Sequence, residues 1–146
     1  MGRPPHVDDL EEYWLWVETA LQATGGYFEH GPYFRVQLLI DDFTNETIGL
    51  SIPQHRMFFH DGTLLEFDLV IDEDFLPTEY SFHFQHIDGP MIWRKDLHPG
   101  HEEELGTEAH IHKNPDDEND RDPFIIVEID EVLDQIRRYQ DTGWTP

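Results

Sequence analysis

Cysteine is absent from this chain of 146 residues, and lysine is nearly so. Without cysteine the protein has no disulfide, no thiolate metal site and no cysteine nucleophile. Any catalytic or metal-binding chemistry must therefore use histidine, carboxylates, arginine, lysine or hydroxyl groups. The sequence also lacks a phosphate-binding glycine loop, a serine nucleophile elbow and the H-E-x-x-H zinc motif.

Long hydrophobic runs are missing as well. No stretch reaches the ~18 apolar residues of a membrane-spanning helix. The segment from Met1 to Asp9 is too polar for the apolar region of a signal peptide. We therefore expect a cytoplasmic protein without a membrane partner. A chain of this length fits a single domain, residues 1–146, of the usual size of ~100–150 residues.

Positive charge is scarce. The 32 acidic residues outnumber nine basic ones, which gives a net charge of −23. Only two of the basic residues are lysines, Lys95 and Lys113. Such a composition is expected of a cytoplasm at molar salt, where the Debye length falls to ~3 Å and self-repulsion is screened. We therefore expect a halophilic source, and at such salt the net charge does not exclude a nucleic acid partner.

The apolar pattern predicts a helix at each end of a sheet. Apolar residues at spacings of three and four predict a helix over residues 8–23, which stops at Gly25-Gly26. The region 33–128 reads as antiparallel strands. A second helix is predicted over residues 129–140, with Asp130 as its N-cap and a loose tail from Asp141. The fold class is α+β, a meandering antiparallel sheet of about six strands with helices on one face.

Eight segments are candidates for these strands, and some are weaker than others. Glu46–Ile52 is a weak candidate that Pro53 should end, and His110–Lys113 is a short one. Asp61-Gly62 and Asp88-Gly89 mark two hairpin turns. The candidates are Tyr33–Ile40, Glu46–Ile52, Arg56–His60, Thr63–Asp72, Glu79–Ile87, Met91–Asp96, His110–Lys113 and Phe124–Glu128.

Histidine is concentrated in one part of the chain. Six of the ten histidines lie between His83 and Lys113, and so do both lysines. In a sequence nearly free of lysine, this window is the best candidate for a site. The six histidines are His83, His86, His98, His101, His110 and His112.

The second hairpin divides into a polar and an apolar face. If Asp88-Gly89 is a two-residue turn, Ile87 opposes Pro90, and directly opposed residues farther along share a face. The predicted pairs are Phe84 with Trp93, His83 with Arg94, Phe82 with Lys95 and Ser81 with Asp96. The polar face then contains Ser81, His83, Gln85, Arg94 and Asp96. Lys95 falls on the apolar face, which indicates an imperfect register at the open end.

Two interpretations of this polar face stay open. One is an ordinary solvated sheet surface, because one face of an antiparallel sheet is often wet. The other is a site in which a histidine transfers protons beside an arginine that binds an anion.

His110 and His112 lie two residues apart, so both side chains point the same way in a strand. This H-x-H spacing suits metal ligation, with His98 and His101 or a carboxylate completing the set. It equally suits proton transfer. We first interpret the histidine-rich window as a site that uses no metal and no cofactor. The alternative is a divalent metal such as zinc held by His98, His101, His110 and His112.

The segments Tyr80–Gln85, Ile92–Asp96 and His110–Lys113, with His98 and His101, resemble the TumE family over roughly Tyr33 to Tyr139. Those proteins are described as toxins of prokaryotic toxin–antitoxin pairs with a helix-turn-helix antitoxin. The family's adjacent histidine pair is spread here into His98-Pro99-Gly100-His101, and residues 41–55 look like an insertion. The matching positions are His83, Gln85, Arg94, Asp96, His101, His110 and His112.

The resemblance implies a toxin with a cognate helix-turn-helix antitoxin, and it makes RNA the first substrate to consider. His83 and one of His110 or His112 would form the acid–base pair. Arg94 and Lys113 would bind phosphate, and Asp96 would orient Arg94 or a histidine. Gln85, Lys95 and His101 are further candidate binding residues.

Two other functions compete with this ribonuclease-like toxin. One is a metal-dependent hydrolase that uses the histidine set. The other is a non-catalytic toxin or binding module that acts by occupying a partner, such as the ribosome or its antitoxin. The sequence leaves the oligomeric state open, including a homo-oligomer.

Overall fold

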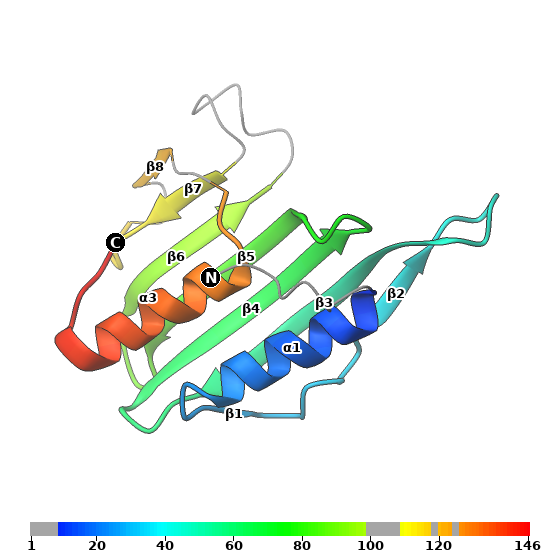
Figure 1. Ribbon diagram of the computed structural model, residues 1–146. Helices are drawn as coiled ribbons and strands as arrows, with labels where there is room; N and C mark the ends of the chain where they lie inside the picture. The colour runs from blue at the N-terminus through cyan, green and yellow to red at the C-terminus, as the bar shows by residue number, and fades with distance from the viewer. Residues whose placement is uncertain (1–8, 99–108, 118–119, 124–125) are drawn as a thin grey trace.

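The computed structural model describes residues 9–98, 109–117, 120–123 and 126–146. In this part of the chain, two helices cover one face of an eight-stranded antiparallel sheet (Figure 1). This confirms the predicted α+β fold and meander, with eight strands rather than about six. The elements are α1 (Leu10–Gln22), β1 (Tyr27–Phe28), β2 (Gln37–Ile40), β3 (Thr47–Phe58), β4 (Thr63–Asp72), β5 (Pro77–His86), β6 (Met91–Leu97), β7 (Ala109–His112), β8 (Arg121–Pro123) and α3 (Ile129–Thr142).

Strands β3 to β8 pair in chain order, and both β1 and β2 pair with β3. Helix α1 begins at Asp9, whose carboxylate accepts a hydrogen bond from the Glu12 amide at 2.8 Å. This contact satisfies one of the free amides at the helix start. The helix stops before Gly25, whose φ of 82° suits glycine.

The strand predictions need correction around β3. Pro53 does not end a strand, because β3 continues through it as a single element to Phe58. The register shifts between Ile52 and His55, and this irregularity accommodates a residue that has no amide to donate. The segment 41–55, interpreted as an insertion, forms the turn after β2 and most of β3. Strand β2 starts only at Gln37, because Arg35 has a φ of 57°, outside the strand region.

The C-terminal predictions also need correction. The last strand is β8, whereas residues 126–128 are not a strand, and residues 124–125 lie outside the described part. Val127 is buried, and its amide donates to the Tyr80 hydroxyl at 3.0 Å, so this residue anchors the entry to α3. The N-cap of α3 is Glu128 rather than Asp130, which lies in the first turn. Helix α3 continues past Asp141 to Thr142, and the Arg138 guanidinium lies 3.9 Å from the Trp144 ring centroid; the loose tail stays a prediction.

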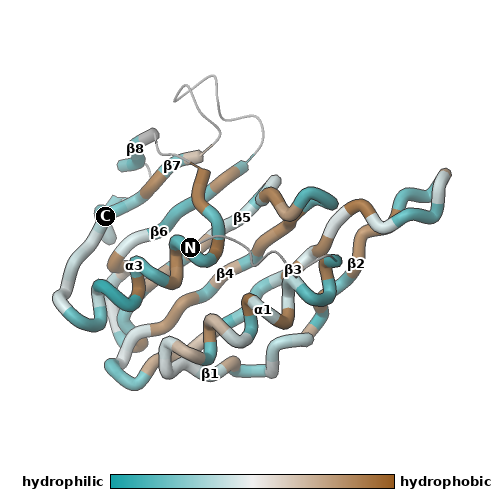
Figure 2. The backbone as a smooth tube through the Cα atoms, viewed as in Figure 1, coloured by the Kyte–Doolittle hydropathy of each residue, from teal (hydrophilic) through white to brown (hydrophobic). Residues whose placement is uncertain are grey.

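The core lies between the helices and the sheet. Hydrophobic and hydrophilic residues follow one another along the central strands (Figure 2). The burial pattern of β4 shows the same period of two, with Leu65, Phe67, Leu69 and Ile71 facing the core. In the described residues, neither helix is long and apolar enough to span a membrane.

Candidate functional site

The hairpin of β5 and β6 has the predicted register over its open half. His83 pairs with Arg94 and Ser81 with Asp96. Beyond Phe84 the register shifts by one residue, and the His86 amide donates to the Pro90 carbonyl. The turn therefore contains three residues, Ile87 to Gly89, instead of two, and Ile87 does not oppose Pro90.

Strand β7 brings the H-x-H pair to this hairpin. His110 lies directly opposite Asp96, and His112 lies directly opposite Arg94. Opposed residues share a face of the sheet, so all four side chains lie on the same face. This is the outer face, because the alternate residue Lys95 points to α3 on the other side. We call Arg94, Asp96, His110 and His112 the Asp96 cluster.

The Asp96 carboxylate is the centre of this cluster. Its Oδ2 atom lies 3.3 Å from His110 Nε2 and 3.1 Å from His112 Nε2. Arg94 Nε lies 3.0 Å from each carboxylate oxygen. The side chains of Asp96, His110 and His112 are exposed by only 1%, 2% and 8%. The strands thus bury one carboxylate and two imidazoles together, with the partly exposed Arg94 beside them.

The electrostatics follow from this burial. Burial alone would raise the pKa of Asp96, but Arg94 and the Ser81 hydroxyl outweigh it, so the pKa lies below its ordinary value. Burial lowers the pKa of His110, although Asp96 acts in the opposite direction. The cluster therefore contains an ionised carboxylate beside an imidazole that favours its neutral form.

More accessible groups lie around the cluster. Burial and then Arg94 lower the pKa of His83, a half-buried residue on β5. His98 is one-third exposed, with Nε2 at 3.9 Å from Asp96 Oδ1 and Nδ1 at 3.9 Å from Glu79 Oε1. Burial raises the pKa of Asp68 on β4, and the charge of His98 acts in the opposite direction. These residues border the cluster and are more exposed than its buried members.

Lys95, a predicted binding residue, lies on the opposite face. It is fully buried, and its ammonium donates to Gln135 Oε1 of α3 and lies 4.9 Å from the Trp93 ring centroid. Burial lowers the pKa of Lys95 to about 8. Its position opposite Phe82 is therefore the true register, and the predicted imperfection at the open end is wrong.

The remaining predicted residues are more dispersed. Gln85 is half-buried on β5, beyond the register shift, and Lys113 is exposed directly after β7. His101 lies outside the described residues. Of the predicted metal set, His110 and His112 come together, His98 lies nearby, and Asp96 takes part in the described cluster.

Two contributors were not assigned a role from the sequence. Ser81 bonds Asp96, and its predicted position opposite Asp96 could have revealed it. Arg121 lies opposite His112 on β8 and acts on the pKa of His110. No pattern in the sequence predicted β8, so nothing there indicated Arg121.

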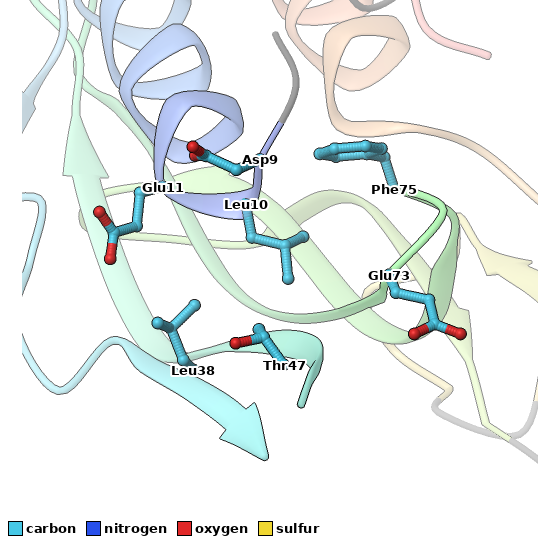
Figure 3. A pocket seen from close by; sticks show the side chains of 7 residues that line it. All are labelled: Asp9, Leu10, Glu11, Leu38, Thr47, Glu73 and Phe75. Atoms are coloured by element: carbon cyan, nitrogen blue, oxygen red, sulfur yellow. The ribbon is translucent and has the colours of Figure 1, made fainter. Parts of the chain in front are cut away.

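The pocket in Figure 3 lies elsewhere in the molecule. It has a volume of about 370 Å³ at the start of α1. The carboxylates of Asp9, Glu11 and Glu73 surround the apolar side chains of Leu10 and Leu38. Its lining contains no histidine or basic residue, so it offers neither a proton-transfer group at neutral pH nor a cation for phosphate.

Comparison with known proteins gives a family. The search of curated proteins and the search of solved structures both found no match to the chain. A family model described as Toxin TumE matches residues 36–140, which include every element from β2 to most of α3. A toxin family implies a cognate antitoxin. The chain therefore belongs to the TumE toxin family.

Proposed function

We propose that this toxin cleaves RNA on the outer face of β5, β6 and β7. The observation that carries the proposal is the Asp96 cluster, in which a buried carboxylate holds an arginine and two histidines beside the accessible His83. Acid–base groups next to a phosphate-binding cation are what the cleavage of a phosphodiester requires.

Arg94 is the group proposed to bind phosphate. Its Nε donates to Asp96, and its side chain is still 37% exposed. A guanidinium has five N–H donors, so the terminal nitrogens can donate to a phosphate while Nε holds the carboxylate. Asp96 thereby acts as a positioning residue for Arg94.

His83 is the proposed general base. It lies opposite Arg94, and its lowered pKa keeps the imidazole neutral and able to accept a proton near neutral pH. In the proposed step His83 takes the proton of a 2′-hydroxyl, and that oxygen attacks the phosphorus. The bond from phosphorus to the 5′-oxygen breaks, and the leaving oxygen receives a proton from the imidazole of His110 or His112, each of which contacts Asp96. The products are a 2′,3′-cyclic phosphate and a 5′-hydroxyl.

Three basic side chains lie at this edge of the sheet, among acids that include Asp96, Asp120 and Asp122. Arg94, Lys113 and Arg121 lie on or beside the three neighbouring strands β6, β7 and β8. Three of the nine basic residues of the chain therefore belong to this edge of the sheet. At the salt we expect for the source, such a local group matters more than the net charge.

The proposal includes a partner and a cellular location. We propose that the cognate antitoxin is a helix-turn-helix protein, as the family resemblance implies, and that the toxin acts in the cytoplasm, where its RNA substrate is found.

The first test compares growth arrest by inducible wild type, His83→Ala, and His60→Ala, an exposed histidine in the turn between β3 and β4. We expect arrest by wild type and His60→Ala, and relief by His83→Ala or by co-expression of the antitoxin. Purified wild type should cleave RNA with the end groups given above, at least ~100-fold faster than His83→Ala.

Arrest that survives His83→Ala without any cleaved RNA would instead favour inhibition by occupancy. The observation behind that second function is the deep burial of Asp96, His110 and His112, which also suits a purely structural network. In that case inhibition should follow the amount of bound partner rather than time.

A further inference from the structure

We propose that Asp96, His110 and His112 bind one divalent transition-metal ion, with zinc as the reference ion. Each side chain offers one ligand atom, and the three atoms lie within 4.8 Å of one another. Two imidazoles and one carboxylate form a common three-ligand set for such ions. We call these three residues the triad.

Two distances inside the triad match those between the ligands of one metal ion. Zinc binds histidine nitrogen and carboxylate oxygen at ~2.0–2.2 Å, so neighbouring ligand atoms lie ~2.8–3.1 Å apart at octahedral angles and ~3.3–3.6 Å apart at tetrahedral angles. The separations from Asp96 Oδ2 to His112 Nε2 and His110 Nε2 are 3.1 and 3.3 Å. The two imidazoles thus converge on one oxygen atom, as they would around a shared ion.

The scaffold fixes these positions. Asp96 and His110 are directly opposed on β6 and β7, and His112 follows on the same face. Ligands on paired strands are held more rigidly than ligands on loops. The Arg94 and Ser81 bonds to Asp96 provide the outer support that ligating carboxylates have in metal sites.

The charges around the triad suit a bound metal cation, which could in turn bind an anion such as phosphate. Arg94 already balances Asp96, and the imidazoles are neutral when they bind a metal. A divalent ion would therefore make this site strongly positive in a protein with a net charge of −23. Three protein ligands leave at least one coordination position for water or a phosphate oxygen, as in catalytic sites.

The proposal that the triad binds an ion does not depend on the proposed function. Only a catalytic role of the ion rests on the proposed RNA cleavage. If the protein cleaves RNA, water on the ion, rather than an imidazole, is the group that protonates the leaving 5′-oxygen, and the ion and Arg94 share the phosphate charge. His83 keeps its role as the base.

The test measures metal content and cobalt spectra of the purified full chain after it is loaded with Zn²⁺ or Co²⁺. Wild type should hold one ion per chain, with visible Co²⁺ bands from nitrogen and oxygen ligands. His110→Ala and His112→Ala should weaken binding by at least about 100-fold, more than the 10–100-fold typical of an outer-shell residue. His60→Ala is the matched control and should stay within about twofold, because His60 is exposed in the turn between β3 and β4, away from the triad.

A second measurement does not depend on whether the variants fold. One equivalent of Zn²⁺ should raise the thermal unfolding midpoint of wild type, and a chelator should reverse the rise, because a ligand that binds only the folded state stabilises it. Folded wild type with no bound ion and no shift would overturn the proposal. So would stoichiometric binding that persists in the folded double variant His110→Ala/His112→Ala.

The two proposals fail differently. An ion that is lost in His112→Ala, in a protein that leaves RNA intact, supports the metal site and contradicts the proposed function. RNA cleavage by protein that binds no ion and ignores the chelator overturns the metal site and leaves the proposed function standing.

Discussion

The two faces of β6 bury charge in different ways. Toward α3, Lys95 is fully buried, donates to the neutral Gln135 and lies 4.9 Å from the Trp93 ring centroid, and Glu131 partly offsets the effect of burial on its pKa. Toward the outer face, Asp96 is equally buried but is surrounded by Arg94 and two histidines. Burial outweighs Glu131 and lowers the pKa of Lys95, whereas Arg94 and Ser81 outweigh burial and lower the pKa of Asp96. The outer face of β6 therefore stabilises its buried charge, whereas the face toward α3 holds its buried cation at a cost in free energy.

Removal of Asp96 should have the largest effect. Asp96→Ala leaves Arg94, His110 and His112 without their common acceptor, so we expect the free energy of unfolding to fall by about 3 kcal/mol. Denaturant unfolding of metal-free protein measures this loss. An unchanged midpoint would mean that the cluster contributes nothing to the fold, and the comparison between the faces would lose its basis.

Replacement of Lys95 should have the opposite sign. Lys95→Met keeps the length of the side chain and removes a desolvated charge, so we expect a gain of roughly 1–3 kcal/mol at neutral pH. Growth arrest should not change, because Lys95 lies on the other face from the Asp96 cluster. Loss of toxicity in a stable Lys95→Met protein would show that the division between the faces is wrong.

The pH dependence of stability measures the cost of burying the Lys95 charge. The pKa of Lys95 is about 8 in the folded protein and 10.5 without burial. Between these values the unfolded chain binds more protons, so the free energy of unfolding should rise with pH, by at most about 3 kcal/mol. Below pH ~8 the cost of the buried charge is constant. Metal-free Lys95→Met, unfolded by denaturant across this range, should lack the rise.

His83 should give a smaller effect, on activity. Burial and Arg94 lower its pKa, and Glu66 and Asp96 oppose them. As a general base it must be neutral, so cleavage should fall on acidification only below the ordinary histidine value of 6.5. Arg94→Gln removes a cation that lowers this pKa and should move the fall to higher pH. If the pH at which cleavage falls is the same in Arg94→Gln, Arg94 does not influence the protonation of His83.

Added salt should raise stability by screening the repulsion between exposed acids. It should have little effect on the buried contacts of the Asp96 cluster. Each exposed pair or repulsion is worth less than about 1 kcal/mol, but salt screens them all. The unfolding midpoint should therefore rise between low and molar salt, by a similar amount in wild type and Asp96→Ala. A transition that does not respond to salt would contradict a halophilic source.

Some of the site could be predicted from local pattern. The Asp88-Gly89 turn fixed the approximate register of the hairpin, so the pairs of His83 with Arg94 and Ser81 with Asp96 were predicted before the structure. The H-x-H spacing likewise placed His110 and His112 on one face. The exact turn length was wrong, because a one-residue register shift at Gln85 has no clear signal in the sequence.

Other features depended on contacts between distant segments. Lys95 suggested a surface binding residue, because lysine is rarely buried, and only the packing of α3 supplies Gln135 as its acceptor. Asp96 was expected to orient Arg94 or a histidine. Its contact with Arg94 and both histidines at once depends on which strand pairs with the free edge of β6.

The sequence by itself determined the class of fold, the histidine-rich window and the family, because periodicity, turn residues and local motifs are properties of neighbouring residues. Tertiary structure alone decided which side of β6 became a packed core and which became a cluster of ionisable groups. The reason is physical: alternation along a strand separates the two faces, but only the placement of α3 and β7 determines what each face meets.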